Sequence, residues 1–108
     1  LVGPAKAKDI LMTARILDAE EAFRIGLVDR IYDPSEIEEK TLEYANLIAS
    51  RFQYTVRAAK LIVRDVLNGA TENSEEVNRL VEGVYDSEDY LEGVRAFLEK
   101  RKPKFTFS

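Results

Sequence analysis

The sequence predicts a mainly α-helical protein with about six helices and one short strand. Apolar residues recur at helical intervals along most of the chain, and capping residues punctuate these stretches. A single segment instead alternates apolar and polar residues, as a strand does. With 108 residues, of which 45% are hydrophobic, we expect one domain, or part of one, with a modest core.

The first third of the chain predicts two helices and the strand. Gly3-Pro4 forms a turn with proline at a permitted first helical position, and about three helical turns follow it. Asp18 and Glu21 form a capping box before a short second helix that ends at Gly26. Residues 27–32 then alternate in polarity and include β-branched side chains. They predict a strand, which needs a pairing partner elsewhere.

The middle of the chain predicts two long amphipathic helices. Ser35 and Glu38 form a second capping box, and the helix after them carries an apolar stripe as far as Ser50. The same pattern returns over residues 54–67, and Asn68-Gly69 stops it.

Two shorter helices complete the expected fold. The first opens at residues 71–74 and runs through Val84, where Asp86-Ser87 breaks it and supplies a new cap. The last runs from about Glu88 and is expected to continue until Pro103 forbids it.

Two reactive residue types, cysteine and histidine, are missing from the sequence, and their absence narrows the chemistry that the chain can perform. The chain therefore lacks a thiol nucleophile, an imidazole base and nearly all zinc ligands, and we expect neither a metal site nor a cofactor. No apolar run is long enough to cross a bilayer and no signal peptide is evident, so the expected compartment is the cytoplasm.

Charge is distributed unevenly along the chain. Residues 94–108 hold five basic residues and one acid, whereas the remaining residues hold 11 bases and 19 acids. Basic residues in a last helical turn are favoured by the helix dipole alone, and they also suit an anionic ligand. The adjacent acid pairs, such as Glu20-Glu21, fall in first helical turns and point about 100° apart, so we assign no catalytic residue to them.

Five short segments occur in a fixed order along the chain. They are Ala-Glu-Glu-Ala at 19–22, Gly-Leu-Val-Asp-Arg-Ile at 26–31, Val-Arg-Ala-Ala-Lys at 56–60, Ser-Glu-Asp with Glu-Gly at 87–93, and Ala-Phe-Leu-Glu-Lys-Arg with Pro103 and Phe105 from residue 96. In this order they resemble the C-terminal part of the enoyl-CoA hydratase/isomerase family, the crotonases. Two positions depart from the family: Ala14 stands where glycine is usual, and Phe52-Gln53 replaces a common Ser-Pro.

The resemblance implies a role in acyl-CoA chemistry. It implies that the catalytic ββα-superhelical core precedes Leu1, and that residues 1–108 alone are inactive. We therefore expect Leu1 to be an internal residue of a longer parent protein. The parent would hydrate 2-enoyl-CoA in fatty-acid oxidation as a trimer or a dimer of trimers, with CoA as part of its substrate. Phe97 and Lys100 match the family's contacts to the adenine and phosphates of CoA.

The family also suggests how the chain divides. Residues 1–33 would be the end of the core-associated helices with the strand, and residues 34–108 a helical oligomerisation region. An alternative function is a free-standing self-assembly module without catalysis, because short amphipathic helices leave apolar surface exposed. We expect no nucleic-acid partner, since the net charge is −4 and no binding motif occurs, and no membrane partner.

Overall fold

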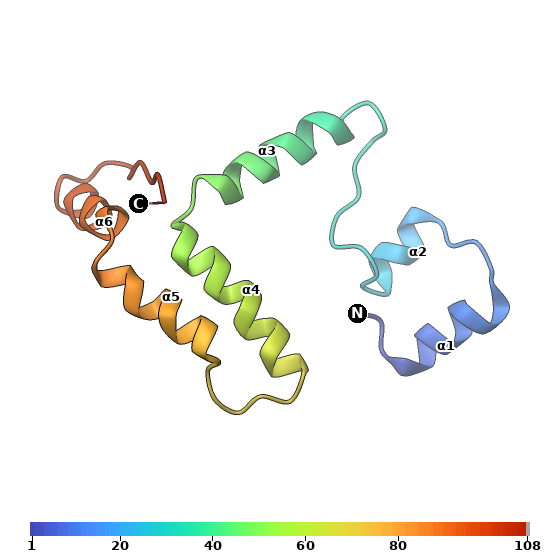
Figure 1. Cartoon of the computed structure of the whole chain (residues 1–108). Helices are drawn as coiled ribbons and strands as arrows, with labels where there is room; N and C mark the ends of the chain where they lie inside the picture. Colours follow the sequence, from blue (N-terminus) through green and yellow to red (C-terminus); the bar gives the residue numbers. More distant parts are fainter. Residues whose placement is uncertain (108) are drawn as a thin grey trace. The chain divides into compact units, whose positions relative to one another are not determined.

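The structure, a computed structural model, describes residues 1–107 and confirms the mainly helical fold class (Figure 1). The chain forms two compact units, residues 1–41 and a second unit that begins at Leu42. Six helices occur in the described part: α1 (Pro4–Thr13), α2 (Ala19–Arg24), α3 (Ile37–Ala49), α4 (Gln53–Leu67), α5 (Glu75–Tyr85) and α6 (Glu88–Leu98).

The strand expected over residues 27–32 is wrong. Neither this segment nor any other part of residues 1–107 forms a β-strand. The backbone N–H groups of Leu27 and Val28 donate to the carbonyl of Ala22, at 2.8 and 3.2 Å, and so close the end of α2. Alternating polarity makes a segment compatible with a sheet, but a strand forms only where a second strand accepts its hydrogen bonds.

An arginine joins α1 to α2 in the first unit. Asp18 caps α2 by accepting a 2.8 Å hydrogen bond from the backbone of Glu21, as predicted. The Glu21 carboxylate does not complete the capping box, because it accepts two 2.8 Å bonds from Arg15 instead. Arg15 also donates to Asp9 of α1. Ala14, which ends α1, has a left-handed φ of 50° and so keeps the conformation of the glycine it replaces.

The start of α3 depends on Asp33. Its carboxylate accepts from the backbone N–H and the hydroxyl of Ser35, at 3.0 and 2.7 Å. These two bonds lower the pKa of Asp33. The Ser35 hydroxyl therefore bonds to Asp33, which precedes α3, and does not cap this helix. The predicted capping box of Ser35 with Glu38 is wrong, and an Asx turn at Asp33 forms in its place.

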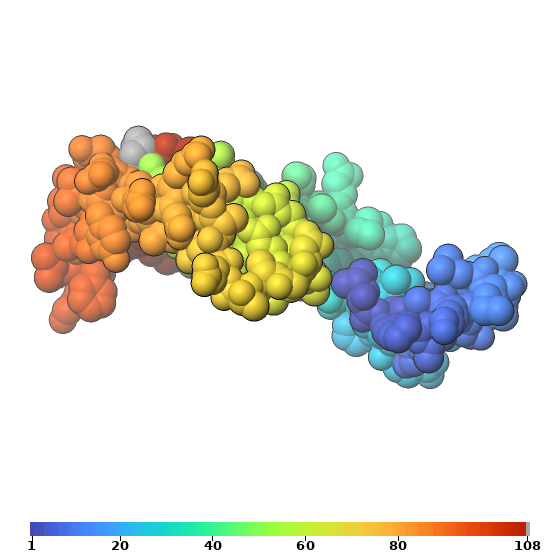
Figure 2. Space-filling view, turned by 60° about the horizontal axis from the view of Figure 1, so that its bottom comes forward, coloured from blue at the N-terminus to red at the C-terminus, as the bar shows by residue number. Residues whose placement is uncertain are grey.

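In the second unit, α4 and α5 form a helical hairpin, and α6 follows α5 after a sharp turn (Figure 1). Val77 of α5 is fully buried. Figure 2 shows α5, α6 and the α4–α5 connection as one continuous surface, in yellow and orange. This arrangement fixes the position of α6, which carries Phe97 and is followed by Lys100.

The turn from α5 to α6 is held by a single hydroxyl. Ser87 is 4% exposed. Its Oγ donates to the carbonyl of Val84 at 2.6 Å and accepts from the backbone N–H of Tyr90 at 3.1 Å. One side chain therefore ends α5 and begins α6, as the sequence predicts from its capping position.

Replacing Ser87 with Ala should lower the free energy of unfolding by about 1–2 kcal/mol, because α6 loses its cap and the Val84 carbonyl loses a donor. Ser50→Ala is the matched control: the Ser50 hydroxyl also donates to a carbonyl three residues earlier, at 2.7 Å, but it is exposed and caps no helix. Urea denaturation followed by circular dichroism measures both. Equal losses in the two variants would contradict this assignment.

Much apolar surface remains uncovered. Among residues 1–107, three apolar residues are buried: Ala22, Val77 and Ala96. Leu67 is 81% exposed, and Leu11 and Met12 of α1 are exposed as well. No helix within residues 1–107 has both the length and the apolar content that a membrane span requires.

Candidate functional site

The C-terminal end of α6 holds both residues that the sequence selects. After Leu98, the backbone N–H of Lys100 donates to the carbonyl of Phe97 at 3.2 Å, and that of Arg101 donates to Ala96 at 3.0 Å. This pair of bonds is the Schellman motif, and it requires a left-handed residue at the Lys100 position. Lys100 has a φ of 54°. The helix thus ends before Pro103, which is not its terminator as expected.

Two other helices of this chain end in the same motif. Gly26 closes α2 with a φ of 81°, and Gly69 closes α4 with a φ of 88°. Glycine takes this conformation freely, whereas a residue with a Cβ pays about 1–2 kcal/mol. Lys100 therefore occupies a position where glycine would be more stable. Strain of this kind is concentrated at functional sites, so the conformation itself draws attention to Lys100.

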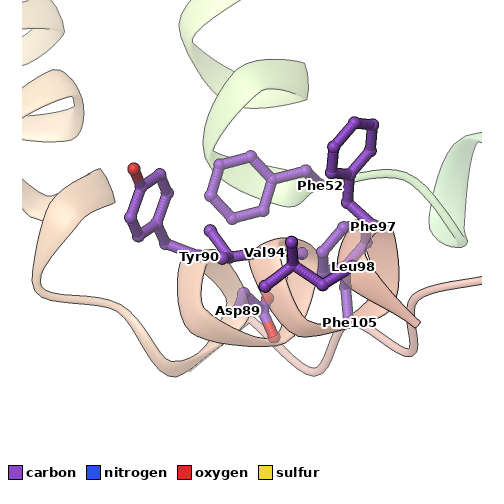
Figure 3. Close-up of a pocket in the computed structure, with 8 residues that line it drawn as sticks. Phe52, Asp89, Tyr90, Val94, Phe97, Leu98 and Phe105 are labelled. Atoms are coloured by element: carbon purple, nitrogen blue, oxygen red, sulfur yellow. The ribbon is translucent and has the colours of Figure 1, made fainter. Parts of the chain in front are cut away.

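Phe97 lies at an apolar pocket of about 340 Å³ in the second unit (Figure 3). Phe52, which precedes α4, points its ring toward α6, and Tyr90 and Phe97 flank it. Phe97 is 82% exposed, so its ring is available to a ligand. Lys100 does not line this pocket. The lining residues are Phe52, Asp89, Tyr90, Gly93, Val94, Phe97, Leu98 and Phe105.

The basic tail folds back along α6. Arg101 donates two hydrogen bonds to the Glu92 carboxylate, at 2.6 and 3.0 Å, and also pairs with Glu99 at 2.5 Å. The backbone N–H of Lys104 donates to Glu92 at 2.9 Å. The positive charge of Arg101 is thus paired within the chain, a pairing that the sequence did not predict.

Asp89 fastens the end of the tail. Asp89 is buried, with only 2% of its surface exposed. Oδ1 accepts from the backbone N–H of Thr106 at 2.7 Å, and Oδ2 accepts from that of Phe107 at 2.6 Å. We call residues 99–107 the C-terminal strap. Sequence analysis missed this use of Asp89 and Glu92, although two acids at i and i+3 on one helical face, ahead of a basic tail, were available as a signal.

The pKa of Glu92 is lowered from its ordinary value of 4.5 to about 2, first by the hydrogen bonds from Arg101 and second by the Lys104 backbone N–H. Because the folded chain binds this proton more weakly than the unfolded chain, Glu92 stabilises the fold fully above pH 4.5. This contribution should disappear as pH falls through about 2. Carboxyl-carbon NMR titration measures it directly. Titration of Glu92 near 4.5 would contradict the strap geometry.

Within residues 1–107, no group of three or more acidic side chains lies so that it could hold a metal ion. A second pocket, of about 650 Å³, lies beside the strap and carries mixed charge. Its lining residues are Glu88, Asp89, Glu92, Arg95, Arg101, Lys102, Lys104 and Thr106. The two pockets share Asp89, so the apolar pocket with the exposed Phe97 ring adjoins a polar pocket that is lined by four cations and three carboxylates.

Comparison with known proteins shows which family this chain resembles in sequence. Residues 1–107 match the model of the enoyl-CoA hydratase/isomerase family. The chain is 37% identical over 106 residues to the crotonyl-CoA hydratase of Syntrophomonas wolfei, covering 97% of this chain and 41% of that protein. It is equally identical, over 101 residues, to the methylmalonyl-CoA decarboxylase of Escherichia coli, covering 91% of this chain and 39% of that protein.

Solved structures agree with the fold. A putative enoyl-CoA hydratase/isomerase family protein from Hyphomonas neptunium is 41% identical and superimposes with a TM-score of 0.86, over 99% of this chain and 41% of that one. An enoyl-CoA hydratase/carnithine racemase from Magnetospirillum magneticum gives 0.85 at 34% identity, over 99% and 40%. The chain spans about two fifths of the length of these relatives. It belongs to the enoyl-CoA hydratase/isomerase family.

Proposed function

We propose that this chain is the C-terminal helical part of an enzyme that acts on acyl-CoA thioesters, most simply the hydration of 2-enoyl-CoA. In this role it supplies subunit contacts and part of the site for the adenine and phosphates of CoA. The catalytic groups belong to a preceding core, so residues 1–108 alone should not hydrate crotonyl-CoA. A hydratase and a decarboxylase share the same sequence identity with this chain, 37%. We propose hydration because more of the similar proteins are named as hydratases.

One observation carries the proposal: a lysine occupies the left-handed end of α6 where glycine would be more stable, one turn from an exposed phenylalanine. The Phe97 ring offers a flat apolar face suited to adenine, and the Lys100 ammonium suits a phosphate. Arg101 is already paired with two carboxylates of the chain. Lys100 is therefore the better candidate for the anionic ligand.

The direct test is the affinity of the native protein for a CoA thioester such as acetoacetyl-CoA. Lys100→Gln should weaken binding of the thioester. Added salt should lower the affinity of the unsubstituted protein more than that of the variant, because salt screens exposed charges. Lys102→Gln is the matched control, since it removes the same charge two residues away. If Lys100→Gln left the affinity unchanged, Lys100 would not belong to the site.

The length of the native polypeptide is a separate test. An antibody against residues 97–107 would capture it from cells for intact-mass measurement. A mass more than twice 12.3 kDa is expected, because this chain covers 41% of its hydratase relative. A native product of about the same mass as this chain would contradict the enzyme proposal.

The exposed apolar faces favour a second candidate, a self-assembly module without catalysis. Leu67 of α4 and Leu42 of α3 are exposed, as are Val63 and Val66. Surface of this kind usually meets a partner. On this proposal the isolated chain associates with itself, and sedimentation velocity would show a concentration-dependent oligomer. A monomer at high concentration would contradict it.

A further inference from the structure

We propose that Asp89 and Glu92 are positioning residues, which hold the C-terminal strap in place as one wall of the apolar pocket. The two acids lie three residues apart on α6 and so face the same side of the helix. Their contacts run in reverse order along the strap. Glu92 binds Arg101 and the backbone of Lys104, whereas Asp89 binds the backbones of Thr106 and Phe107. The strap therefore runs antiparallel to α6.

The residue between these two anchors enters the pocket. Phe105 follows Lys104 and precedes Thr106, and its ring lies 5.3 Å from that of Phe52, centre to centre. The Phe105 ring also lies over Gly93, where an added Cβ would sit 3.6 Å from it. Phe105 is the strap's member of the pocket lining (Figure 3). Fixing the backbone on both sides of Phe105 fixes its ring as a wall.

The far end of the strap is attached to α4. The centre of the Phe107 ring lies 5.0 Å from that of the Tyr54 ring. The Arg57 guanidinium lies over the Phe107 ring, 3.9 Å from its centre. Neither phenylalanine of the strap is buried. Apolar burial alone is therefore a weak attachment, and the strap depends on hydrogen bonds from backbone N–H groups to charged carboxylates, which are the stronger kind.

This geometry gives the two acids an indirect role in binding. Asp89 also lines the apolar pocket. Both oxygens of its carboxylate accept hydrogen bonds from the strap, so the carboxylate acts on a ligand through Phe105. The identity of that ligand as the apolar part of an acyl-CoA rests on the proposed function. The attachment of the strap does not, and it can be measured separately.

The absence of tryptophan from the sequence makes a clean probe possible. Phe105→Trp in the 108-residue chain introduces a single tryptophan into the pocket wall, and selective excitation separates its emission from that of the five tyrosines. Adding Asp89→Asn should shift its emission to longer wavelength and raise iodide quenching severalfold, because an amide cannot accept from both strap N–H groups. Adding Glu88→Gln is the control, since it removes the same charge from the neighbouring, exposed position of α6.

Equal emission and quenching in the Asp89→Asn and Glu88→Gln chains would overturn the proposal. If Asp89→Asn abolishes the helical circular dichroism, Glu92→Gln decides in the same assay. That variant removes the Arg101 pair but leaves an acceptor for Lys104, so partial release of the strap is expected and no release would overturn the proposal.

Acetoacetyl-CoA binding by the native protein separates the two proposals. Weaker binding in the variant whose strap is released supports the positioning role, and unchanged binding overturns it. If the unsubstituted protein binds no CoA thioester at all, the proposed function fails, while the fluorescence result still decides whether the carboxylates hold the strap.

Discussion

Replacing Val77 with Asp is expected to unfold the α4–α5 hairpin. Val77 is 0% exposed and shares a pocket with Ile62 and Val66 of α4. Asp65 lines the same pocket, and its Oδ2 atom is buried and accepts no hydrogen bond within residues 1–107. A second carboxylate there would be both desolvated and close to a like charge.

An uncompensated buried charge costs about 3–5 kcal/mol, and a unit of this size has a total stability of a similar order. The variant should therefore lose most of its cooperative unfolding transition, measured by circular dichroism during heating. Asn78→Asp adds the same charge at the next, exposed residue of α5 and should melt like the unsubstituted chain. Matching melting curves for the Val77→Asp chain and the unsubstituted chain would show that this valine is not at the centre of the hairpin.

Lys100→Gly should change stability and ligand binding in opposite directions. Relief of the left-handed strain, about 1–2 kcal/mol, outweighs the extra entropy of an unfolded glycine, about 0.4–1 kcal/mol. The free energy of unfolding should rise by about 0.5–1 kcal/mol, because the same motif with glycine already closes α2 and α4 at Gly26 and Gly69. Denaturation in urea measures this gain.

Affinity for a CoA thioester should fall about tenfold in the same variant, the weakening expected when an exposed charged hydrogen bond is lost. Lys100→Gln separates the two effects, because it removes the charge and keeps the left-handed Cβ. It should bind as weakly as Lys100→Gly without any gain in stability. A glycine variant that gains stability and keeps its full affinity would show that the lysine is only a poor helix cap.

The helices themselves could be predicted from the sequence. Asp18, Ser74 and Ser87 each accept a hydrogen bond from the backbone N–H three residues later. Such bonds depend on neighbours in the chain, so residue type and spacing indicate them. The same pattern failed at Ser35, because its hydroxyl donates to Asp33 instead. The five ordered segments were likewise enough to identify the family, which the match over residues 1–107 confirms.

Sequence reasoning failed where a distant partner decides the outcome. Residues 27–32 have the polarity of a strand, but their first N–H groups close α2, and residues 1–107 contain no second strand that pairs with them. The pairing of Arg101 with Glu92 was not predicted either, because Glu92 lies nine residues earlier, on α6. Neither contact has a local pattern that reveals it.

The sequence by itself therefore determined the helices, the N-caps at Asp18 and Ser87, and the family. The helices and these caps depend on forces that act within about one helical turn. Only the tertiary structure placed Lys100 in a left-handed cap and folded the strap back so that Phe105 faces Phe52. The Asp89 carboxylate meets backbone groups 17 and 18 residues away. Contacts of this length depend on how the chain turns after α6, and this turn is set by packing and charge pairing together.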